Sequence, residues 1–504
     1  MRTPIAAVVT IVLVLSACAQ PEPTTDARNV VLITVDALRA DSVSWAGASF
    51  DTTPNLAALA ADAVVFDQAL TSFPGTTASM PSLMTGLFPS FEGVGEWNSF
   101  TYHGFNEFET AEEAERPALS GNLRMLAEIL AERGMTTVGF NTNPNLTAPR
   151  NFNQGFMEYE DFAAYMKSAR ESRRHPLEAA YPPADVVMAK AVPALRAVAG
   201  EPFFMWIHLM EPHSPYLPPD DHARVSPRTF TGLGDLEING ALYHFLQRQW
   251  GASPEKITHP SLDELGISRA ALTEHLLGLY EGEIHFCDAE LGRFVETMRE
   301  LGLLNDTLFI LTADHGEEFF DHGYVTHHFK SGLAEELIRI PLLIRPPGGL
   351  PGGRRVEQLV RMVDIAPTVL DFVGHRAAAA QMEGATLRPL MDGRSEEPRT
   401  AFFSTIPYQI VRTERWKYRL ERPSDPSGET TQRLFDIVAD PMETDDLAAR
   451  HPEIVAELRT RYEEFARSLA DRTASPGDGE PGPTAPHQID EETRRQLEAL
   501  GYVE

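Results

Sequence analysis

The chain has 504 residues, and 43% of them are apolar, so it can bury a large core and divide into two or three domains. It carries 73 acidic and 43 basic residues, which gives a formal net charge of -30. A protein of this charge repels nucleic acid and anionic lipid surfaces, so we expect no nucleic-acid partner and no membrane binding through the folded surface.

The first 18 residues have the features of an export signal. Arg2 precedes an apolar stretch, Ile5 to Leu15, that is too short to span a bilayer comfortably, and Leu-Ser-Ala-Cys follows at 15–18. These four residues resemble a bacterial lipobox, which implies cleavage before Cys18, a lipid on that cysteine and a tether over 19–28. We therefore expect an exported protein, lipid-anchored in the bacterial cell envelope on its periplasmic or extracellular face. The alternative is an ordinary cleaved signal with a chance cysteine.

The first predicted strand is Asn29 to Val35, a nearly continuous apolar and β-branched run typical of a central parallel strand. It ends at Asp36. A carboxylate at the end of a buried strand needs a partner, and either a metal ion or the N-terminus of a helix would provide one.

A helix and then a strand are predicted over 53–66, and a segment rich in hydroxyl groups follows, from Thr71 to Pro89. The hydroxyl groups surround Pro74 and Gly75, a pattern that fits a turn and a helix cap. If the segment packs at the same sheet edge as Asp36, one hydroxyl is placed to act as a metal-activated nucleophile. The candidates are Thr76, Thr77, Ser79 and Ser82.

The next two predicted strands also end in polar residues. An amphipathic helix, Leu119 to Gly134, leads to a strand over 136–140, which opens into an Asn-rich loop that suits a polar pocket and contains Asn143. Phe203 to Leu209 is a buried strand that runs into Glu211-Pro212-His213. Residues 215–275 are less patterned, and we interpret them as an insertion without assigned chemistry.

A long helix and a short buried strand precede an acidic loop. The helix is predicted from Tyr280 to Leu301 and contains Cys287, which fits a small buried hydrophobic side chain better than a nucleophile. Because Cys18 is the only other cysteine, we expect no disulfide within the mature chain. The strand, Leu308 to Leu311, leads into Asp314-His315-Gly316. Such a pair is either a solvated loop or a metal site, and ligands at other strand ends favour the metal site.

Strands alternate with helices throughout 29–374, including a strand from Ile338 to Ile344, which predicts a doubly wound α/β sheet, mixed but mostly parallel. Short runs at Tyr408 to Arg412 and Trp416 to Leu420 then indicate an antiparallel hairpin, and an amphipathic helix follows. The predicted organisation is a signal peptide (1–18), a tether (19–28), a catalytic α/β domain (29–375), a smaller α+β domain (376–472), and a Pro- and Gly-rich linker with a short terminal helix (473–504).

Metal ligands and anion-binding groups thus follow separate strands. They are Asp36, a hydroxyl near Thr76 and the pair Asp314-His315, with His213 and Lys330 as potential cationic groups. This set suits chemistry on a tetrahedral oxyanion, because a divalent cation lowers the pKa of a hydroxyl and neutralises an equatorial oxygen while the other cations hold the remaining charge.

Seven segments resemble, in order, the motifs of the sulfatase branch of the alkaline phosphatase superfamily, over about Asn29 to Ala448. Seven ordered matches are far more specific than any one of them, and they imply an alkaline phosphatase-like fold. The segments are NVVLITVDALRAD, TASMPSLMTGLFP, MEPHSPYLPP, ADHGEEFFDHG, KSGLAEELIRIPLLIRPPG, VDIAPTVLDFVG and LFDIVADPMETDDLA.

The resemblance also implies roles for individual residues. The family's spacing back from Thr85-Gly86 puts Thr76 at the nucleophile position. Lys330 and His213 resemble the residues that hold the anionic group and protonate the leaving oxygen. The implied metal ligands are Asp36, Thr76, Asp314 and His315.

At the nucleophile the sequence departs from true sulfatases. Those enzymes need a Cys or Ser matured to formylglycine, with Pro two places and Arg four places later, whereas this chain has Thr76, Ala78 and Met80. Thr76 instead resembles the nucleophile of the phosphodiesterases and phosphoglycol or phosphoethanolamine transferases of the superfamily, which pass through a phosphothreonine. Ala37 stands where many sulfatases have a second acidic residue, which favours one cation over two.

The leading hypothesis is a metal-dependent hydrolase or transferase of a small, anionic phosphoric ester, with Thr76 as nucleophile and His213 as general acid or oxyanion donor. Two alternatives stay open: a sulfuric-ester hydrolase that works without formylglycine or through Ser79, and a catalytically silent, lipid-anchored binding protein. The expected cofactor is one divalent cation, and Zn²⁺, Mn²⁺ and Ca²⁺ are all compatible with the ligands. We interpret Asn143 as a substrate-binding residue, and His327 and His328 as solvent-facing.

Overall fold

An eight-stranded sheet is the centre of the computed structural model, with strand order β10-β2-β9-β6-β1-β5-β3-β4. All of its strands are parallel except β9, which is antiparallel to both neighbours. The mixed, mostly parallel sheet expected from the sequence is therefore confirmed. The strands are β1 (Asn29–Val35), β2 (Val64–Leu70), β3 (Thr136–Asn141), β4 (Glu158–Glu160), β5 (Phe203–Leu209), β6 (Thr307–Ala313), β9 (Arg339–Arg345) and β10 (Arg354–Arg361). The structure describes residues 26–89, 119, 121, 123–171, 177, 181–249, 257, 259–327, 331–405, 407–422 and 429–473.

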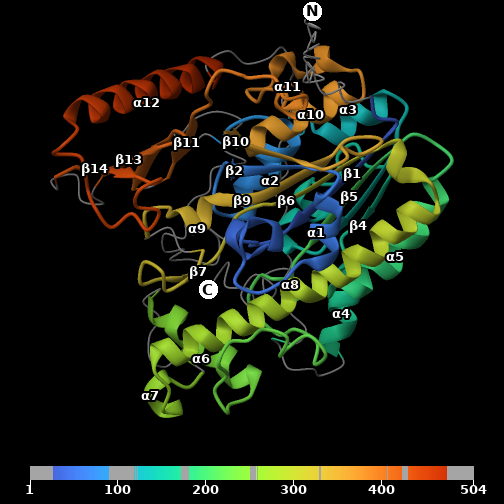
Figure 1. Ribbon diagram of the computed structural model, residues 1–504. Coiled ribbons are helices and arrows are strands. Elements are labelled where there is room, and N and C mark those ends of the chain that lie inside the picture. The colour runs from blue at the N-terminus through green and yellow to red at the C-terminus, as the bar shows by residue number, and fades with distance from the viewer. Residues whose placement is uncertain are drawn as a thin grey trace, which may run out of the picture.

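Helices cover both faces of this sheet (Figure 1). One layer contains α1 (Pro54–Ala60), α5 (Ala184–Val198) and α8 (Arg269–Glu300), and both α1 and α5 pack against α8. The opposite layer contains α2 (Thr76–Thr85), α3 (Leu126–Glu132) and α10 (Ile365–Phe372). Because the central strands are covered on both sides, every residue of β1, β5 and β6 is buried, which is why these strands read as unbroken apolar runs.

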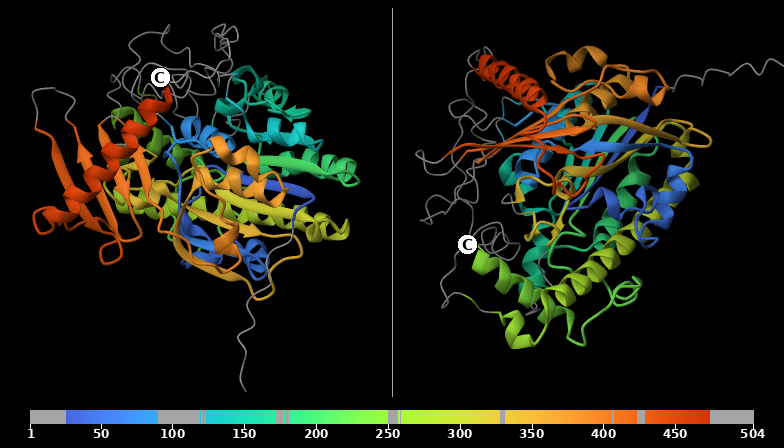
Figure 2. Two further views of the ribbon diagram at one scale, coloured as in Figure 1. Left: turned by 90° about the horizontal axis from the view of Figure 1, so that it is seen from above. Right: turned by 60° about the vertical axis from the view of Figure 1, so that its left-hand side comes forward.

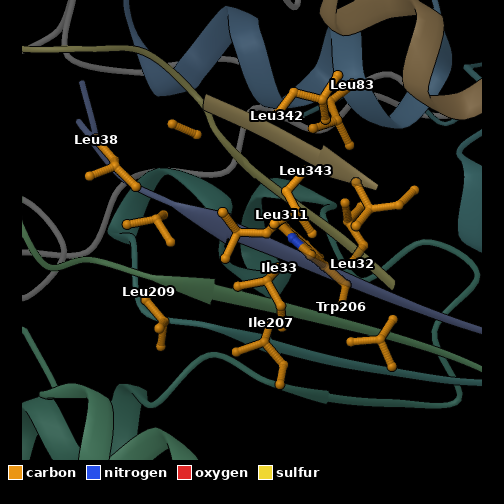
Figure 3. Packing of buried hydrophobic residues seen from close by; sticks show 14 of the residues in the cluster. Leu32, Ile33, Leu38, Leu83, Trp206, Ile207, Leu209, Leu311, Leu342 and Leu343 are labelled. Atoms are coloured by element: carbon orange, nitrogen blue, oxygen red, sulfur yellow. The ribbon is translucent and has the colours of Figure 1, made fainter. Parts of the chain in front are cut away.

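The core between the layers combines aliphatic and aromatic side chains. Figure 3 shows Ile33 of β1 beside Leu311 of β6 and Ile207 of β5, with Leu343 of β9 nearby, and all four side chains are fully buried. Truncating one such residue to Ala costs about 2–5 kcal/mol. The carboxyl ends of the strands are therefore held on a rigid platform.

A second, four-stranded antiparallel sheet follows the α/β part, in the order β11-β12-β13-β14. Its strands are β11 (Ala401–Ser404), β12 (Tyr408–Arg412), β13 (Trp416–Glu421) and β14 (Thr431–Asp436), and α12 (Pro452–Thr473) packs on it (Figure 2). The predicted hairpin is confirmed as β12 and β13. The two edge strands, AFFS and TQRLFD, were not predicted, because they carry little apolar alternation.

The structure corrects two helix predictions. The helix expected from Leu119 is confined to α3, and the long helix expected from Tyr280 begins at Arg269. The segment interpreted as an insertion without pattern holds two further helices, α6 (Asp235–Gln249) and α7 (Leu262–Leu265). The remaining short elements are α4 (Ala163–Glu171), α9 (Glu335–Ile338), α11 (Arg388–Met391), β7 (Glu318–Phe319) and β8 (Val325–Thr326).

Both predicted terminal segments fall outside the described residues. They are the signal peptide with most of the tether, and the linker with the terminal helix. Within the part of the chain that the structure describes, none of the helices has the length and apolar character needed to cross a bilayer.

Candidate active site and metal centre

Two buried carboxylates meet at the carboxyl edge of the sheet. Asp36 directly follows β1 and Asp314 directly follows β6, and these strands are paired in register up to Val35 and Ala313. Between them, Ala37 adopts a left-handed conformation with φ 56°, which is strained for a residue with a Cβ. That turn allows the Ala37 N–H to donate to Asp314 Oδ1 at 3.1 Å, so the backbone fixes the orientation of the second carboxylate.

Thr76 lies against both carboxylates. It is the first residue of α2, and its hydroxyl donates to Asp314 Oδ2 at 2.7 Å and lies 3.4 Å from Asp36 Oδ2. Asp36 and Asp314 are 40 and 238 positions from Thr76 in the sequence, yet both lie close enough to its hydroxyl for one ion to contact all three side chains. Ser79, the alternative nucleophile, is buried further along α2, and its Oγ forms no hydrogen bond with the described residues.

His315 completes a group of ligands suited to a cation. Its Nδ1 lies 2.8 Å from the Gly316 carbonyl oxygen, which can only accept, so Nδ1 carries the proton of the neutral ring and Nε2 carries a lone pair. That Nε2 is 3.5 Å from Asp314 Oδ2 and 3.6 Å from Asp36 Oδ1. Ligand atoms about 2.0–2.2 Å from a common ion are separated by such distances.

Two ligand atoms in this group lack any hydrogen bond within the described part of the chain. Asp36 Oδ1 and His315 Nε2 are both buried and unsatisfied, and burying such atoms without a partner is costly. A divalent cation held by Asp36, Thr76, Asp314 and His315 would satisfy both of them. The residues therefore fit the metal that the sequence implies, and Asp36, Asp314 and His315 each offer an atom within 4.8 Å of the others.

The pKa values reflect the crowding of charge. Burial raises the pKa of Asp314, and the neighbouring Asp36 raises it further. Burial also acts to raise the pKa of Asp36, but the hydrogen bond with His208 and the charges of His213 and His315 outweigh it, and the net shift is downward. Burial lowers the pKa of His315 less than the two carboxylates raise it. The raised pKa values of Asp314 and His315 disfavour their ligating forms, the carboxylate and the neutral ring, and a cation would stabilise both.

Asn143 and His213 stand beside the two carboxylates. Asn143 follows β3, and its Nδ2 donates to Asp36 Oδ2 at 2.7 Å and to Thr76 Oγ1 at 3.3 Å. His213 is fully buried in the loop after β5, and its Nδ1 donates to the Ser214 carbonyl oxygen at 2.6 Å. Burial lowers the pKa of His213 to about 4, so the ring is neutral at pH 7 and acts as an acid only after an anion favours its protonated form.

The remaining predicted residues have different outcomes. Lys330, His328 and Cys18 lie outside the described residues. The interpretation of His327 as solvent-facing was wrong, because its side chain is only 10% exposed and its ring centroid lies 4.6 Å from that of His315 and 5.0 Å from that of His213. Cys287 is buried and free, as expected for a small hydrophobic side chain in α8.

A sequence model of the family described as "Sulfatase" matches residues 28–375, more than half of the chain. The chain belongs to the sulfatase family. A second model, described as "N-sulphoglucosamine sulphohydrolase, C-terminal", matches residues 321–468.

Relatives with curated names support the same assignment. The arylsulfatase of Clostridium perfringens (strain 13 / Type A) is 27% identical over 400 residues, which cover 73% of this chain and 79% of that one. The choline-sulfatase of Rhizobium meliloti (strain 1021) is 26% identical, with coverages of 84% and 83%. The chain is therefore a sulfatase-family hydrolase acting on a sulfate or phosphate ester, and members of this family bind a divalent metal.

Solved structures show the same fold. The phosphonate monoester hydrolase of Silicibacter pomeroyi superimposes with a TM-score of 0.64 at 21% identity, covering 89% of this chain and 96% of that one. A protein in complex with its substrate D-glucosamine-2-N,6-O-disulfate superimposes with a TM-score of 0.65 at 18% identity, with coverages of 89% and 99%.

Sequence reasoning missed two residues that surround the site of this sulfatase-family chain, Glu317 and His208. Glu317 is fully buried, accepts a hydrogen bond from the Tyr216 hydroxyl at 3.0 Å and has an oxygen 3.2 Å from His327 Nδ1. Burial raises the pKa of Glu317 to about 7. His208, in the middle of an apolar run, lies 3.2 Å from Asp36. For His208 the signal was a polar side chain among apolar ones, whereas Glu317 lies in an acidic run in which nothing distinguishes it from its neighbour Glu318.

A second group of potential ligands has another explanation. Glu318, His322 and Glu336 lie within 4.8 Å of one another. However, His322 Nδ1 lies 2.6 Å from Glu336 Oε1 and its Nε2 lies 3.0 Å from the Met442 carbonyl oxygen. The hydrogen bond with Glu336 raises the pKa of His322 to about 9, and each ring nitrogen faces an oxygen acceptor, so at pH 7 both nitrogens donate and neither presents a lone pair. His322 and Glu336 thus form an ion pair within the α/β part, and the bond from His322 to the Met442 carbonyl oxygen links this pair to the C-terminal part.

Proposed function

We propose that this sulfatase-family protein cleaves or transfers a small phosphoric ester, with Thr76 as the nucleophile. The observation that carries the proposal is the position of the Thr76 hydroxyl, which donates to Asp314 Oδ2 at 2.7 Å beside the two unsatisfied ligand atoms. Threonine cannot be converted to formylglycine, the group on which the sulfatase mechanism depends. A hydroxyl nucleophile instead suits phosphoryl transfer through a phosphothreonine.

In this proposal each residue around Thr76 has a separate role in the reaction. The Thr76 proton passes to Asp314, the acceptor that its hydroxyl already faces. Asn143 holds the Asp36 carboxylate and the Thr76 oxygen in place. Thr76 stands at the N-terminus of α2, where the helix dipole favours an anionic phosphoryl group. A divalent cation held by Asp36, Thr76, Asp314 and His315 would lower the pKa of the hydroxyl and neutralise charge on the phosphoryl oxygens.

The bond changes balance within these groups. The Thr76 oxygen forms a bond to phosphorus as the bond from phosphorus to the leaving oxygen breaks. His213, protonated when the anion is bound, gives its proton to that leaving oxygen, and Lys330 is proposed to hold the anionic group. Water, or an acceptor alcohol in a transferase, then attacks phosphorus and gives its proton to the neutral His213. The bond from phosphorus to the Thr76 oxygen breaks, and that oxygen regains its proton from Asp314.

A panel of aryl esters that share the leaving group p-nitrophenol tests the proposal. Phosphate monoester, phosphate diester, phosphonate and sulfate are assayed with Mn²⁺ or Zn²⁺ for the wild type, Thr76→Ala and Thr76→Ser. We expect phosphorus esters to be preferred, Thr76→Ala to lose at least 10³-fold in kcat, about 4 kcal/mol, and Thr76→Ser to retain part of the activity. Thr85→Ala is the control, because Thr85 lies at the far end of α2 and its hydroxyl, among the described residues, bonds to the Pro81 carbonyl oxygen. Unchanged turnover in Thr76→Ala would remove Thr76 from the mechanism.

A sulfuric-ester hydrolase without formylglycine is the second candidate, favoured by the arylsulfatase and choline-sulfatase among the relatives. Preference for the sulfate ester in the same panel would select it. A catalytically silent binding protein would cleave none of the esters with any metal. The unsatisfied Asp36 Oδ1 and His315 Nε2 argue against that reading, because an idle site has no need for them.

We also propose that the protein is anchored to the cell envelope by a lipid on Cys18 and has no nucleic-acid partner. The lipobox-like sequence and the net charge of -30 support this. Metabolic labelling with a radioactive fatty acid should mark the wild type but not Cys18→Ser. Equal labelling of both proteins, or none, would contradict the anchor.

A further inference from the structure

A chain of hydrogen bonds crosses the buried sheet and ends on Asp36. The indole Nε1 of Trp206 donates to Thr34 Oγ1 at 3.0 Å, and Thr34 Oγ1 lies 2.8 Å from His208 Nδ1. His208 Nε2 in turn lies 3.2 Å from Asp36 Oδ2. The pairing of β1 with β5 produces this geometry, since Thr34 and His208 are directly opposite in the register. All four side chains are fully buried (0%).

The chemistry of the partners fixes the direction of the protons. An indole N–H only donates, so Thr34 Oγ1 accepts from Trp206 and its own proton goes to His208 Nδ1. His208 therefore carries its proton on Nε2 and donates it to Asp36. The reverse tautomer would leave the Thr34 proton without an acceptor among the hydrogen bonds of the described residues and would turn a lone pair toward a carboxylate.

The two carboxylate oxygens of Asp36 differ in the hydrogen bonds that they accept. Oδ2 accepts from His208 and from Asn143, at 3.2 and 2.7 Å. Oδ1 has no hydrogen bond within the described part of the chain and faces His315 Nε2 at 3.6 Å. The hydrogen-bonded oxygen is thus held by the protein, and the other oxygen is presented to the cation site.

We propose that His208 is a positioning residue, whose tautomer is set by Thr34 and Trp206 and which orients Asp36 so that Oδ1 faces the cation. The proposal rests on the metal-binding function proposed above and deepens it. Groups that orient metal ligands in this way typically contribute 10- to 100-fold in metal affinity. A histidine that merely filled the core would contribute to folding alone and would not alter the affinity for metal.

The test measures Mn²⁺ affinity, by counting free Mn²⁺ with electron paramagnetic resonance, together with thermal stability and kcat. We expect His208→Leu to bind Mn²⁺ about 10- to 100-fold more weakly. His208→Gln keeps a donor near the Nε2 position and should retain most of the affinity. We expect Thr34→Val, which has nearly the same shape and leaves His208 in place, to weaken binding by roughly 3- to 10-fold through the lost hydrogen bonds.

Thr312→Val is the matched control. Thr312 is paired with Thr34 across β1 and β6, is equally buried, and its hydroxyl bonds to the Pro341 carbonyl oxygen rather than to the chain that ends on Asp36. We expect its Mn²⁺ affinity to match the wild type. If His208→Leu does not fold, the comparison of Thr34→Val with Thr312→Val decides the question.

The outcomes separate the two proposals. Failure of the wild type to bind Mn²⁺, Zn²⁺ or Ca²⁺ would overturn the proposed function. Metal binding by the wild type with equal affinity in His208→Leu, or in Thr34→Val where His208→Leu does not fold, would overturn the role of His208 alone. Weaker binding in Thr34→Val than in Thr312→Val, at similar thermal stability, supports it.

Discussion

Replacing the amide of Asn143 with a carboxylate tests the geometry of the site most sharply. Asn143 Nδ2 donates to Asp36 Oδ2 at 2.7 Å, so Asn143→Asp places a second negative charge there. At this separation two unit charges in an effective dielectric of about 20 repel by roughly 6 kcal/mol. Taking up a proton at pH 7.5 costs about 5 kcal/mol from an ordinary pKa of about 3.9. The variant therefore protonates, and metal-free Asn143→Asp should lose about 5 kcal/mol of stability at that pH.

The loss should depend on pH in a defined direction. The introduced carboxyl group has a folded-state pKa raised above its unfolded value, so the penalty is present at high pH and fades as pH falls toward the unfolded pKa. Between pH 7.5 and 5.5 about 3 kcal/mol should be recovered, at about 1.36 kcal/mol per pH unit. Thermal unfolding of the chelator-treated proteins at both pH values measures this.

Metal should rescue this variant selectively. A cation beside the three carboxylates neutralises their repulsion, so Mn²⁺ should raise the Tm of Asn143→Asp by more than that of the wild type, while kcat falls because Thr76 loses a donor. Asn239→Asp is the control: Asn239 is fully buried and its amide bonds to the backbone of Tyr216 and Asp235 rather than to a proposed metal ligand, so its destabilisation should not respond to Mn²⁺. Equal stability of metal-free Asn143→Asp and wild type at pH 7.5 would refute the assigned geometry.

Two further substitutions test the packing around Gly316 and the His322–Glu336 ion pair. Gly316→Ala should abolish metal binding, because the added Cβ would lie 1.9 Å from the Glu336 carbonyl oxygen; Gly200→Ala, where the Cβ meets nothing within 4 Å, should behave as wild type in Mn²⁺ titrations. The hydrogen bond with Glu336 raises the pKa of His322 to about 9, so its contribution to stability is complete below about pH 6.5 and is lost as pH rises through 9. Glu336→Gln should remove that part of the Tm-versus-pH curve, and an unchanged curve would mean that the pair contributes nothing.

Much of the site could be predicted because the apolar runs of the central strands end abruptly at polar residues. The apolar runs of β1 and β5 were predicted with the bounds that the structure shows, and β1 ends where Asp36 begins. A residue that follows a parallel strand lies at one edge of the sheet by geometry alone. To predict that Asp36 and Asp314 lie close together, it was therefore enough to see that each follows a buried parallel strand.

What escaped prediction depends on contacts between distant segments. The direction of β9 is set by its neighbours β2 and β6, because a strand's residue pattern is the same in either direction. His208 reads as a core residue in FFMWIHL, and its meaning comes from Thr34, which lies 174 positions away. His327 sits in a polar local sequence, yet it is buried through contacts with Glu317 and the rings of His213 and His315.

The reason for a glycine at position 316 likewise depends on a contact with a distant segment. Gly316 is not among the residues with positive φ, so a left-handed turn does not explain why a glycine stands here. The requirement is instead close approach, since the carbonyl oxygen of Glu336 occupies the space that a Cβ would need. Such a contact with α9 cannot be read from the loop itself.

The location of a bound cation tests the central claim most directly. Crystals grown with Mn²⁺ and measured at its absorption edge should give one anomalous peak, enclosed by Asp36 Oδ1, Thr76 Oγ1, Asp314 and His315 Nε2. A peak at Glu318, His322 and Glu336, or crystals of active protein with no peak beside Thr76, would contradict the account.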